Sequence, residues 1–260
     1  MGIGDQLCLL SAIQVVSDRV GRENVQIWYD SAYPGSADVF GMGGLVACDP
    51  GTPAGYPSGH TVIPCQGHIM AGPIGDTLPA PYGEYQGNPI RQVFYNWGWH
   101  GLFGGQSITL RLYPDGGALR QAQKIASEYG RFITCTPLEV SRHNNNCDAS
   151  AWHNLLARVD ISATILFGCA PAERDQLAGM IGDMHLPHKT DIISGGLAQW
   201  KALVDIAPEN YTGNSCGMWL AFASRTPTYL LQHETPEHRH NTMWNYKMKW
   251  NCKNIVLIKI

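Results

Sequence analysis

The sequence is poor in charge: Asp, Glu, Lys and Arg make up 15% of its 260 residues, and the formal net charge is −3. This balance excludes a general basic surface for polyanions, although it leaves a local basic groove open. The chain also has no run of 18 apolar residues and no charged-then-apolar segment at its start. We therefore expect no transmembrane helix, no secretory signal and a cytoplasmic location.

Paired cysteine motifs are absent as well. The eight cysteines are scattered without a Cys-x-x-Cys pair, and several lie in apolar runs such as FITCTP and ILFGCAP. This distribution is typical of buried free thiols in a reducing compartment. One group, Cys48, His60, Cys65 and His68, has metal-ligating side chains, but its spacings fit no zinc pattern. We therefore predict no metal site.

The two ends of the chain raise a question about strand order. MGIGDQLCLLSAI is a glycine-rich turn leading into a helix over residues 5–20, and in nucleotide-binding α/β domains a buried strand precedes such a turn. The chain ends with NIVLIKI, whose composition predicts a buried parallel strand. We predict that strand 254–260 is the first strand of the N-terminal domain's sheet, which makes the protein circularly permuted. An edge strand of the second domain, or exchange with a neighbouring chain, remains an alternative.

Strands and helices alternate after Gly130. FITCTP and ISATILFGCA predict strands, and CDASAWHNLLARV, PAERDQLAGMIGDM and GLAQWKALVDIA predict helices. This alternation predicts a right-handed parallel α/β domain, whereas residues 31–90 predict loops around short strands. The expected fold is α/β, with two Rossmann-like domains facing a cleft. The predicted domains are an acceptor-side domain of residues 1–130 plus 245–260 and a nucleotide-sugar-binding domain of residues 131–244.

The opening turn and residues 131–231 resemble the heptosyltransferase-like glycosyltransferases of the GT-B group. That group has a G-x-G-D turn before an apolar helix, as in MGIGDQLCLL, and an apolar strand before a helix start with Glu, as in ATILFGCAPAERDQL. TGNSCGMWLAF resembles the group's N-D-S-G turn with departures. Ser215 or Cys216 replaces the usual Asp, Trp219 stands where the group has His, and the usual lysine of the polar loop is absent. The resemblance covers about half of the chain.

The resemblance implies a glycosyltransferase that moves a sugar from a nucleotide-diphosphate sugar to an acceptor hydroxyl, with inversion and without a metal or other cofactor. It implies that Asp5 is the catalytic base, facing the donor across the cleft. A helix N-terminus lowers the pKa of a carboxylate and so weakens it as a base, while desolvation on closure opposes this effect. A role for Asp5 as the N-cap of the first helix remains open.

Donor binding is expected at the edge of the second domain's sheet. Backbone N–H groups of a glycine-rich turn such as GNSCG suit a diphosphate. Arg142 is suited to pair with phosphate. The resemblance implies that Glu173 is the acid that contacts the ribose, since a carboxylate can accept from both hydroxyls of a diol, although a first-turn acid also stabilises a helix. Thr134 and Thr136 end a strand at the edge where such sheets bind ligands. The predicted donor-binding residues are Thr134, Thr136, Arg142, His143, Glu173, Asn214, Ser215, Cys216 and Gly217.

The residues also bear on two other function classes. The departures from the family turn favour a non-catalytic GT-B-like binding or assembly protein, whereas Asp5 and Glu173 favour an enzyme. GMGG at 41–44 lacks the strand–GxGxxG–helix context of a dinucleotide-dependent oxidoreductase. The expected partners are a nucleotide sugar and an acceptor that is a glycan, a protein or a modified nucleic acid, and a homo-oligomer remains open.

Overall fold

The computed structural model describes residues 3–29, 35–48, 61–65, 110–138, 147–213, 215–232 and 253–259. The chain divides into two compact units, Met1–Tyr113 with Arg239–Asn251 and Pro114–His238 with Cys252–Ile260. Within the described ranges, no helix combines the length and the apolar character that crossing a membrane requires.

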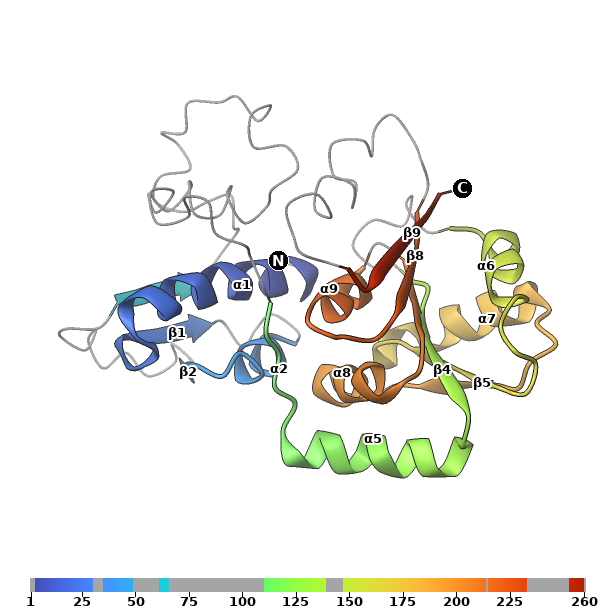
Figure 1. Ribbon diagram of the computed structural model, residues 1–260, viewed down its shortest axis with the longest axis horizontal. Coiled ribbons are helices and arrows are strands. Elements are labelled where there is room, and N and C mark those ends of the chain that lie inside the picture. Colours follow the sequence, from blue (N-terminus) through green and yellow to red (C-terminus); the bar gives the residue numbers. More distant parts are fainter. Residues whose placement is uncertain are drawn as a thin grey trace. The chain divides into compact units, whose positions relative to one another are not determined.

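Unit 1 is built from a long helix, a short helix and a parallel sheet in the order β2-β1-β3 (Figure 1). Its apolar side chains Leu7, Leu10 and Ile13 are buried, as their helical spacing predicts. The first helix begins at Ile3, so Asp5 lies inside its first turn rather than before it. The elements are α1 (Ile3–Val20), η1 (Arg22–Asn24), β1 (Val25–Tyr29), α2 (Ser36–Gly41), β2 (Val46–Cys48) and β3 (Thr61–Cys65).

A buried amide joins α1 to the segment that leads out of unit 1. Gln14 Nε2 donates to Gly43 O at 3.0 Å and to Arg111 O at 2.7 Å. Gln14 Oε1 accepts from Arg111 N at 2.9 Å. Both polar atoms of this side chain therefore have partners, which is the usual condition of a buried amide.

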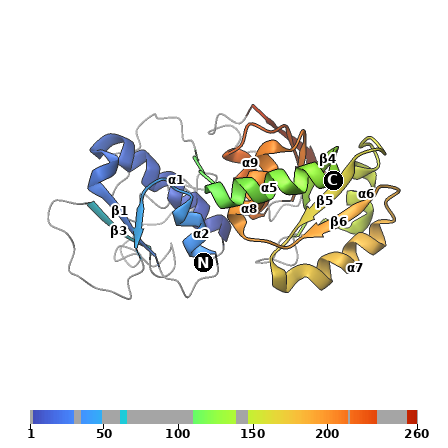
Figure 2. The ribbon, with the colours of Figure 1, turned by 90° about the horizontal axis from the view of Figure 1, so that it is seen from below.

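Unit 2 contains a six-stranded parallel sheet in the order β6-β5-β4-β7-β8-β9. Numbered along the chain this is the order 3-2-1-4-5-6 of dinucleotide-binding folds. Helices α6 and α7 cover one face, and α5, α8 and α9 cover the other (Figure 1, Figure 2). The predicted parallel α/β arrangement is confirmed. The elements are α5 (Gly116–Tyr129), β4 (Phe132–Thr136), α6 (Ala149–Leu156), β5 (Thr164–Gly168), η5 (Pro171–Glu173), α7 (Arg174–Met184), β6 (Thr190–Ile193), α8 (Leu197–Ile206), β7 (Asn210–Thr212), α9 (Cys216–Phe222), β8 (Thr228–Gln232) and β9 (Ile255–Lys259).

The boundary between the units differs from the predicted one. It falls between Tyr113 and Pro114 rather than near Gly130. Helix α5 forms where the sequence places it, with Gly130 at its C-cap in a positive-φ conformation (φ 65°). However, α5 packs against α8 and so belongs to unit 2.

The pairing of the C-terminal strand contradicts our prediction that it inserts into the sheet of unit 1, and so removes the basis for the circular permutation inferred from that prediction. β9 forms as expected, but it pairs with β8, from Thr228 opposite Ile255 to Gln232 opposite Lys259. It is therefore the sixth strand of the unit 2 sheet and not the first strand of unit 1. An apolar, β-branched strand suits either sheet, and the residue just before it supplies the specific attachment.

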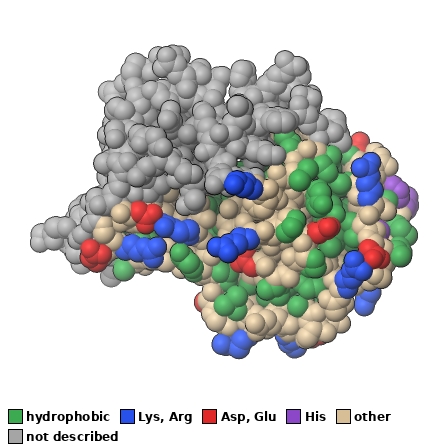
Figure 3. Space-filling model, in the orientation of Figure 1, with side chains coloured by type: hydrophobic (Ala, Val, Ile, Leu, Met, Phe, Trp, Pro, Cys, Tyr) green, Lys and Arg blue, Asp and Glu red, His purple; other side chains and the backbone are tan. Residues whose placement is uncertain are grey.

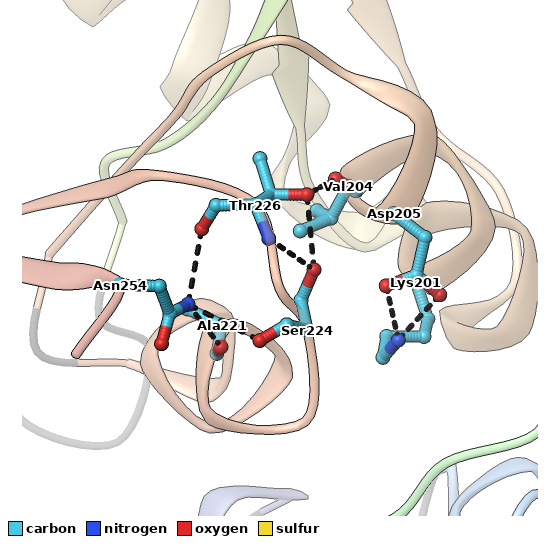
Figure 4. Close-up of polar contacts among 7 residues, drawn as sticks. All are labelled: Lys201, Val204, Asp205, Ala221, Ser224, Thr226 and Asn254. Carbon is cyan, nitrogen blue, oxygen red and sulfur yellow. Dashed lines mark hydrogen bonds and ion pairs between the residues drawn. The ribbon is translucent and has the colours of Figure 1, made fainter. Parts of the chain in front are cut away.

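Asn254 attaches this strand to the turn between α9 and β8 (Figure 4). Its Nδ2 donates to Ala221 O at 3.2 Å, Ser224 O at 3.1 Å and Thr226 O at 3.0 Å. Its own carbonyl accepts from Thr228 N at 2.8 Å, which continues the ladder between the two strands. Asn254 thus connects the end of α9 and the turn after it to the start of β9.

Replacing this amide is expected to destabilise unit 2. Asn254→Ala removes the donor shared by three carbonyl groups, of which Ala221 O and Thr226 O keep the Ser224 N and Thr228 Oγ1 donors. We therefore expect the free energy of unfolding to fall by about 1–2 kcal/mol. Urea denaturation followed by tryptophan fluorescence measures the effect. Lys253→Ala, at an exposed neighbouring position, is the control and should stay within about 0.5 kcal/mol of the parent. Equal effects of the two substitutions would contradict the role given to Asn254.

Candidate functional site

The candidate site lies at the carboxyl ends of β4 and β7. These strands are neighbours at the point where the order of the sheet reverses, and the helices that follow them, α6 and α9, lie on opposite faces of the sheet. Thr136 and Thr212, which end the two strands, stand opposite each other. Gly213 N donates to Thr136 O at 2.9 Å and carries the pairing one residue further. In open α/β sheets, ligands bind outside this reversal point.

Helix α9 begins directly against this edge, and Gly217 makes that approach possible. A Cβ atom on Gly217 would overlap Thr212 Oγ1 and would lie 2.9 Å from Thr136 Cβ. Ser215 is the N-cap of α9, and its hydroxyl oxygen accepts from Gly217 N at 3.2 Å. The Ser215 O–H group can still donate outward. Of the predicted diphosphate contacts, Ser215 and Gly217 are thus held close to both strand ends.

Trp200 is a further residue of this edge that the sequence patterns do not predict. Its Nε1 donates to Thr136 Oγ1 at 2.9 Å, although it belongs to the first turn of α8. The indole also lies over Gly168, at the end of β5, where a Cβ atom would overlap the ring. A glycine ending an apolar strand is the one local signal of this contact, and it does not identify the partner.

The two predicted threonines have different environments. Thr134 is fully buried, and its hydroxyl donates to Asn210 Oδ1 at 3.0 Å, so it holds β4 to β7 inside the sheet. Thr136 lies two residues further along, at the edge, where its hydroxyl is oriented by Trp200. Of the two, Thr136 has the position for ligand contact.

Glu173 and Cys216 come from different loops and lie within electrostatic range of each other. Burial raises the pKa of the Glu173 carboxyl, and the hydrogen bond that it accepts from Ala170 N at 3.2 Å partly opposes this. Burial, and secondly the charge of Glu173, raise the pKa of the Cys216 thiol to about 11. The thiol is therefore protonated at neutral pH, and the nearby carboxylate is the ionisable group of the edge.

Several predicted site residues lie outside the described residues. Arg142, His143 and Asn214 are among them, and so is the side chain of Asp5, although its backbone belongs to α1. His60 and His68 of the weak metal constellation lie outside as well. Within the ranges that are described, no three His, Cys, Asp or Glu side chains gather as a metal ion would need.

The described surface shows no concentration of positive charge in the view of Figure 3. Lys and Arg side chains are interspersed with Asp and Glu across it. This agrees with the small net charge of the whole sequence.

Comparison with solved structures identifies proteins of the same fold. A family 9 glycosyltransferase from Veillonella parvula DSM 2008 matches with a TM-score of 0.63 and 10% identity, over 100% of this chain and 84% of that one. The ADP-heptose lipopolysaccharide heptosyltransferase II of E. coli gives 0.66 and 9%, over 99% and 88%. An E. coli heptosyltransferase with ADP gives 0.59 and 12%, over 100% and 91%.

No protein-family model matches the sequence, and no curated protein matches it at the sequence level. At 9–12% identity, the likeness to the solved structures shows the fold. The resemblance seen in the motifs is confirmed at that level, because the fold is that of a family 9 glycosyltransferase and of heptosyltransferases. The structural likeness extends over 99–100% of this chain, whereas the sequence motifs covered about half of it.

Proposed function

We propose that this protein is a glycosyltransferase that moves a sugar from a nucleotide-diphosphate sugar to an acceptor hydroxyl. The proposal depends on one observation: the strand order reverses between β4 and β7, which places a ligand-binding edge there, in a chain whose fold matches glycosyltransferases along its full length. One of the similar structures contains ADP and another contains ADP-2-deoxy-2-fluoro heptose. The donor class follows from that similarity, and the sugar is left open.

Unit 2 is assigned the donor. The tight approach of α9 at Gly217 lets backbone N–H groups and the Ser215 hydroxyl approach a diphosphate, which bears negative charge as it leaves. Glu173 would accept hydrogen bonds from both ribose hydroxyls. We propose that Arg142 and His143 supply the positive charge and that Asn214 contacts the same group. These groups replace a metal in the proposed reaction.

Unit 1 is assigned the acceptor. We propose that Asp5 takes the proton from the attacking hydroxyl, which then displaces the diphosphate with inversion at the sugar carbon. A general base must lie within about 3 Å of the proton that it removes. Its place in the first turn of α1 favours the ionised carboxylate, which is the form that a base requires.

A second candidate is a protein that binds nucleotide sugars without turning them over. The observation that favours it is Trp219, which stands where the resembling family has His and is buried in the body of α9. Its indole packs against Phe222, with 5.4 Å between the ring centroids. An indole in that place supplies neither a proton nor a positive charge.

Thermal-shift measurements with ADP, UDP, GDP, CDP and dTDP, and then with sugar conjugates of any that bind, test the two candidates. We expect at least one diphosphate to raise the midpoint, because binding to the folded state stabilises it. A donor that is then hydrolysed or transferred supports the enzyme, and the activity should survive EDTA. Binding without turnover supports the second candidate. No shift with any nucleotide would contradict both.

The role of Glu173 predicts a pH dependence. Because burial raises its pKa, this carboxyl takes up a proton at a higher pH than an ordinary Glu, for which the value is about 4.3. Nucleotide affinity should therefore fall on acidification, starting above that value. Glu173→Gln should lower affinity about tenfold at neutral pH and remove this pH dependence.

The pKa shift of Glu173 also has a consequence for stability. Because the folded-state pKa is raised, the contribution of Glu173 to the free energy of unfolding is fully present below the unfolded-state pKa and is lost as the pH rises through the folded-state pKa.

Calorimetric titration of the nucleotide at a series of pH values, from acidic to neutral, measures the predicted change in affinity. Asp175→Asn, at an exposed position in the first turn of α7, is the control. A pH profile shared by the parent and Glu173→Gln would contradict the assignment.

A further inference from the structure

One buried polar side chain of α1 differs from the rest. Gln6, Ser11, Gln14 and Ser17 are all nearly inaccessible to solvent, with at most 1% exposed. Gln14 and Ser17 have the hydrogen bonds expected of such groups, and Ser11 is also engaged. Within the described part of the chain, however, neither Nε2 nor Oε1 of Gln6 has a hydrogen-bond partner. Burying an amide with both atoms unpaired is costly, and folded proteins rarely do so.

The position of Gln6 relates this unpaired amide to the ligand-binding edge of unit 1. It lies in the first turn of α1, and long side chains of a helix lean toward the helix N-terminus. That end lies at Gly35, which follows β1 and precedes α2, because a Cβ atom on Gly35 would be 3.0 Å from Ile3 Cδ1. Gln6 is therefore at the carboxyl-end side of β1, where parallel sheets bind ligands.

The chemistry of the amide indicates the kind of ligand. A side-chain amide offers two donors and an acceptor on adjacent atoms. A sugar diol offers the same two functions, so a diol can satisfy both amide atoms at once. An anion would satisfy the NH₂ group only and would face the partial negative charge of Oε1. Asp5 already gives this helical turn the negative charge that a helix N-terminus favours.

We propose that Gln6 is a substrate-binding residue, whose amide pairs with two hydroxyl groups of a neutral acceptor sugar at the first turn of α1. This inference rests on the proposed function, with a sugar as the acceptor. It gives that sugar a polar contact in the same helical turn as Asp5. The unpaired amide then lowers the stability of the free protein, and its two polar atoms gain hydrogen-bond partners only when the sugar is bound.

The test uses the whole protein with methyl glycosides of glucose, galactose, mannose and N-acetylglucosamine as probes. In ¹H–¹⁵N spectra, the side-chain NH₂ signals of Gln6 are identified by their loss in Gln6→Met. We expect these signals to shift with at least one glycoside, and the Kd for that glycoside to rise about tenfold in Gln6→Met. The melting midpoint of the free variant should rise by about 2–4 °C, because an unpaired polar group has been removed.

Gln14→Met is the matched control, because it is the same substitution on the same helix at the same burial. It breaks three hydrogen bonds, so its melting midpoint should fall while its Kd for the glycoside stays unchanged. Three results would overturn the inference. They are no response of the Gln6 signals to any of the glycosides, an unchanged Kd in Gln6→Met, and a loss of stability in Gln6→Met equal to that in Gln14→Met.

The result can be separated from the fate of the proposed function. Binding of a nucleoside diphosphate to the parent protein is measured independently, on unit 2. If a nucleotide binds and no glycoside moves the Gln6 signals, the inference fails and the proposed function stands. If a glycoside binds through Gln6 and no nucleotide binds, the proposed function fails and the sugar site stands.

Discussion

Gly217→Ala should reduce nucleotide affinity about a hundredfold. The added methyl group would overlap Thr212 Oγ1 and press on Thr136 Cβ, so α9 must move away from the strand ends. The N–H groups assigned to the diphosphate move with it, and misplacement of a binding group by about 1 Å is enough for a loss of this size. The same strain should lower the free energy of unfolding by about 1–3 kcal/mol. Calorimetric titration of the nucleoside diphosphate and urea denaturation measure the two effects.

Gly179→Ala is the control for this substitution. Gly179 lies within α7, and a Cβ atom there would meet nothing within 4 Å. Alanine is the better helix former, so this variant should be about 0.5–1 kcal/mol more stable and should bind nucleotide normally. If Gly217→Ala lowers the free energy of unfolding but leaves the nucleotide affinity unchanged, the ligand does not contact the start of α9.

Asp5→Asn should lower the rate of sugar transfer by about 10²–10⁴-fold, the usual contribution of a general base. The amide is close in size to the carboxylate and cannot accept the proton of the attacking hydroxyl. Nucleotide affinity should be unchanged, because the proposal assigns the donor to unit 2. Initial rates of transfer with the donor found by the nucleotide panel measure the first effect, and calorimetry measures the second.

Asp18→Asn on the same helix is the matched control. Asp18 forms an ion pair with Arg111 at 2.7 Å on the surface of unit 1, and such pairs contribute at most about 1 kcal/mol. Its transfer rate should equal that of the parent. If Asp5→Asn and Asp18→Asn both keep full activity, Asp5 is a first-turn acid that stabilises α1 and the base lies elsewhere.

Local patterns predicted most of unit 2. Apolar runs such as ATILFG become strands buried on both faces, since a central parallel strand has no solvated side. Asp148 caps α6 by accepting from Ala151 N at 2.7 Å, as expected of an acid before an amphipathic run. The strand β6 was not predicted. It has four residues, all half-buried, and lies at the end of the sheet, so it lacks the apolar run of its neighbours.

Contacts between distant residues could not be predicted in the same way. NIVLIKI was correctly predicted as a strand, but its composition does not specify a sheet, and the three bonds of Asn254 involve carbonyls about thirty residues away. The bond from Trp200 to Thr136 spans 64 positions. Glycines gave a partial signal, because Gly168 and Gly217 both stand where another element packs closely. A sequence shows that such space is needed without showing what fills it.

Hydrogen–deuterium exchange of the whole protein, with and without the tightest-binding nucleoside diphosphate, tests whether the nucleotide binds at the carboxyl ends of β4 and β7. We expect slower exchange on nucleotide binding in the peptides that contain Thr136, Glu173 and Gly217, which end β4, follow β5 and begin α9. Peptides of the opposite edge, which contain the amino ends of the same strands, should be unchanged. Protection confined to unit 1, or spread evenly over unit 2 without a maximum at these three positions, would contradict binding at this edge.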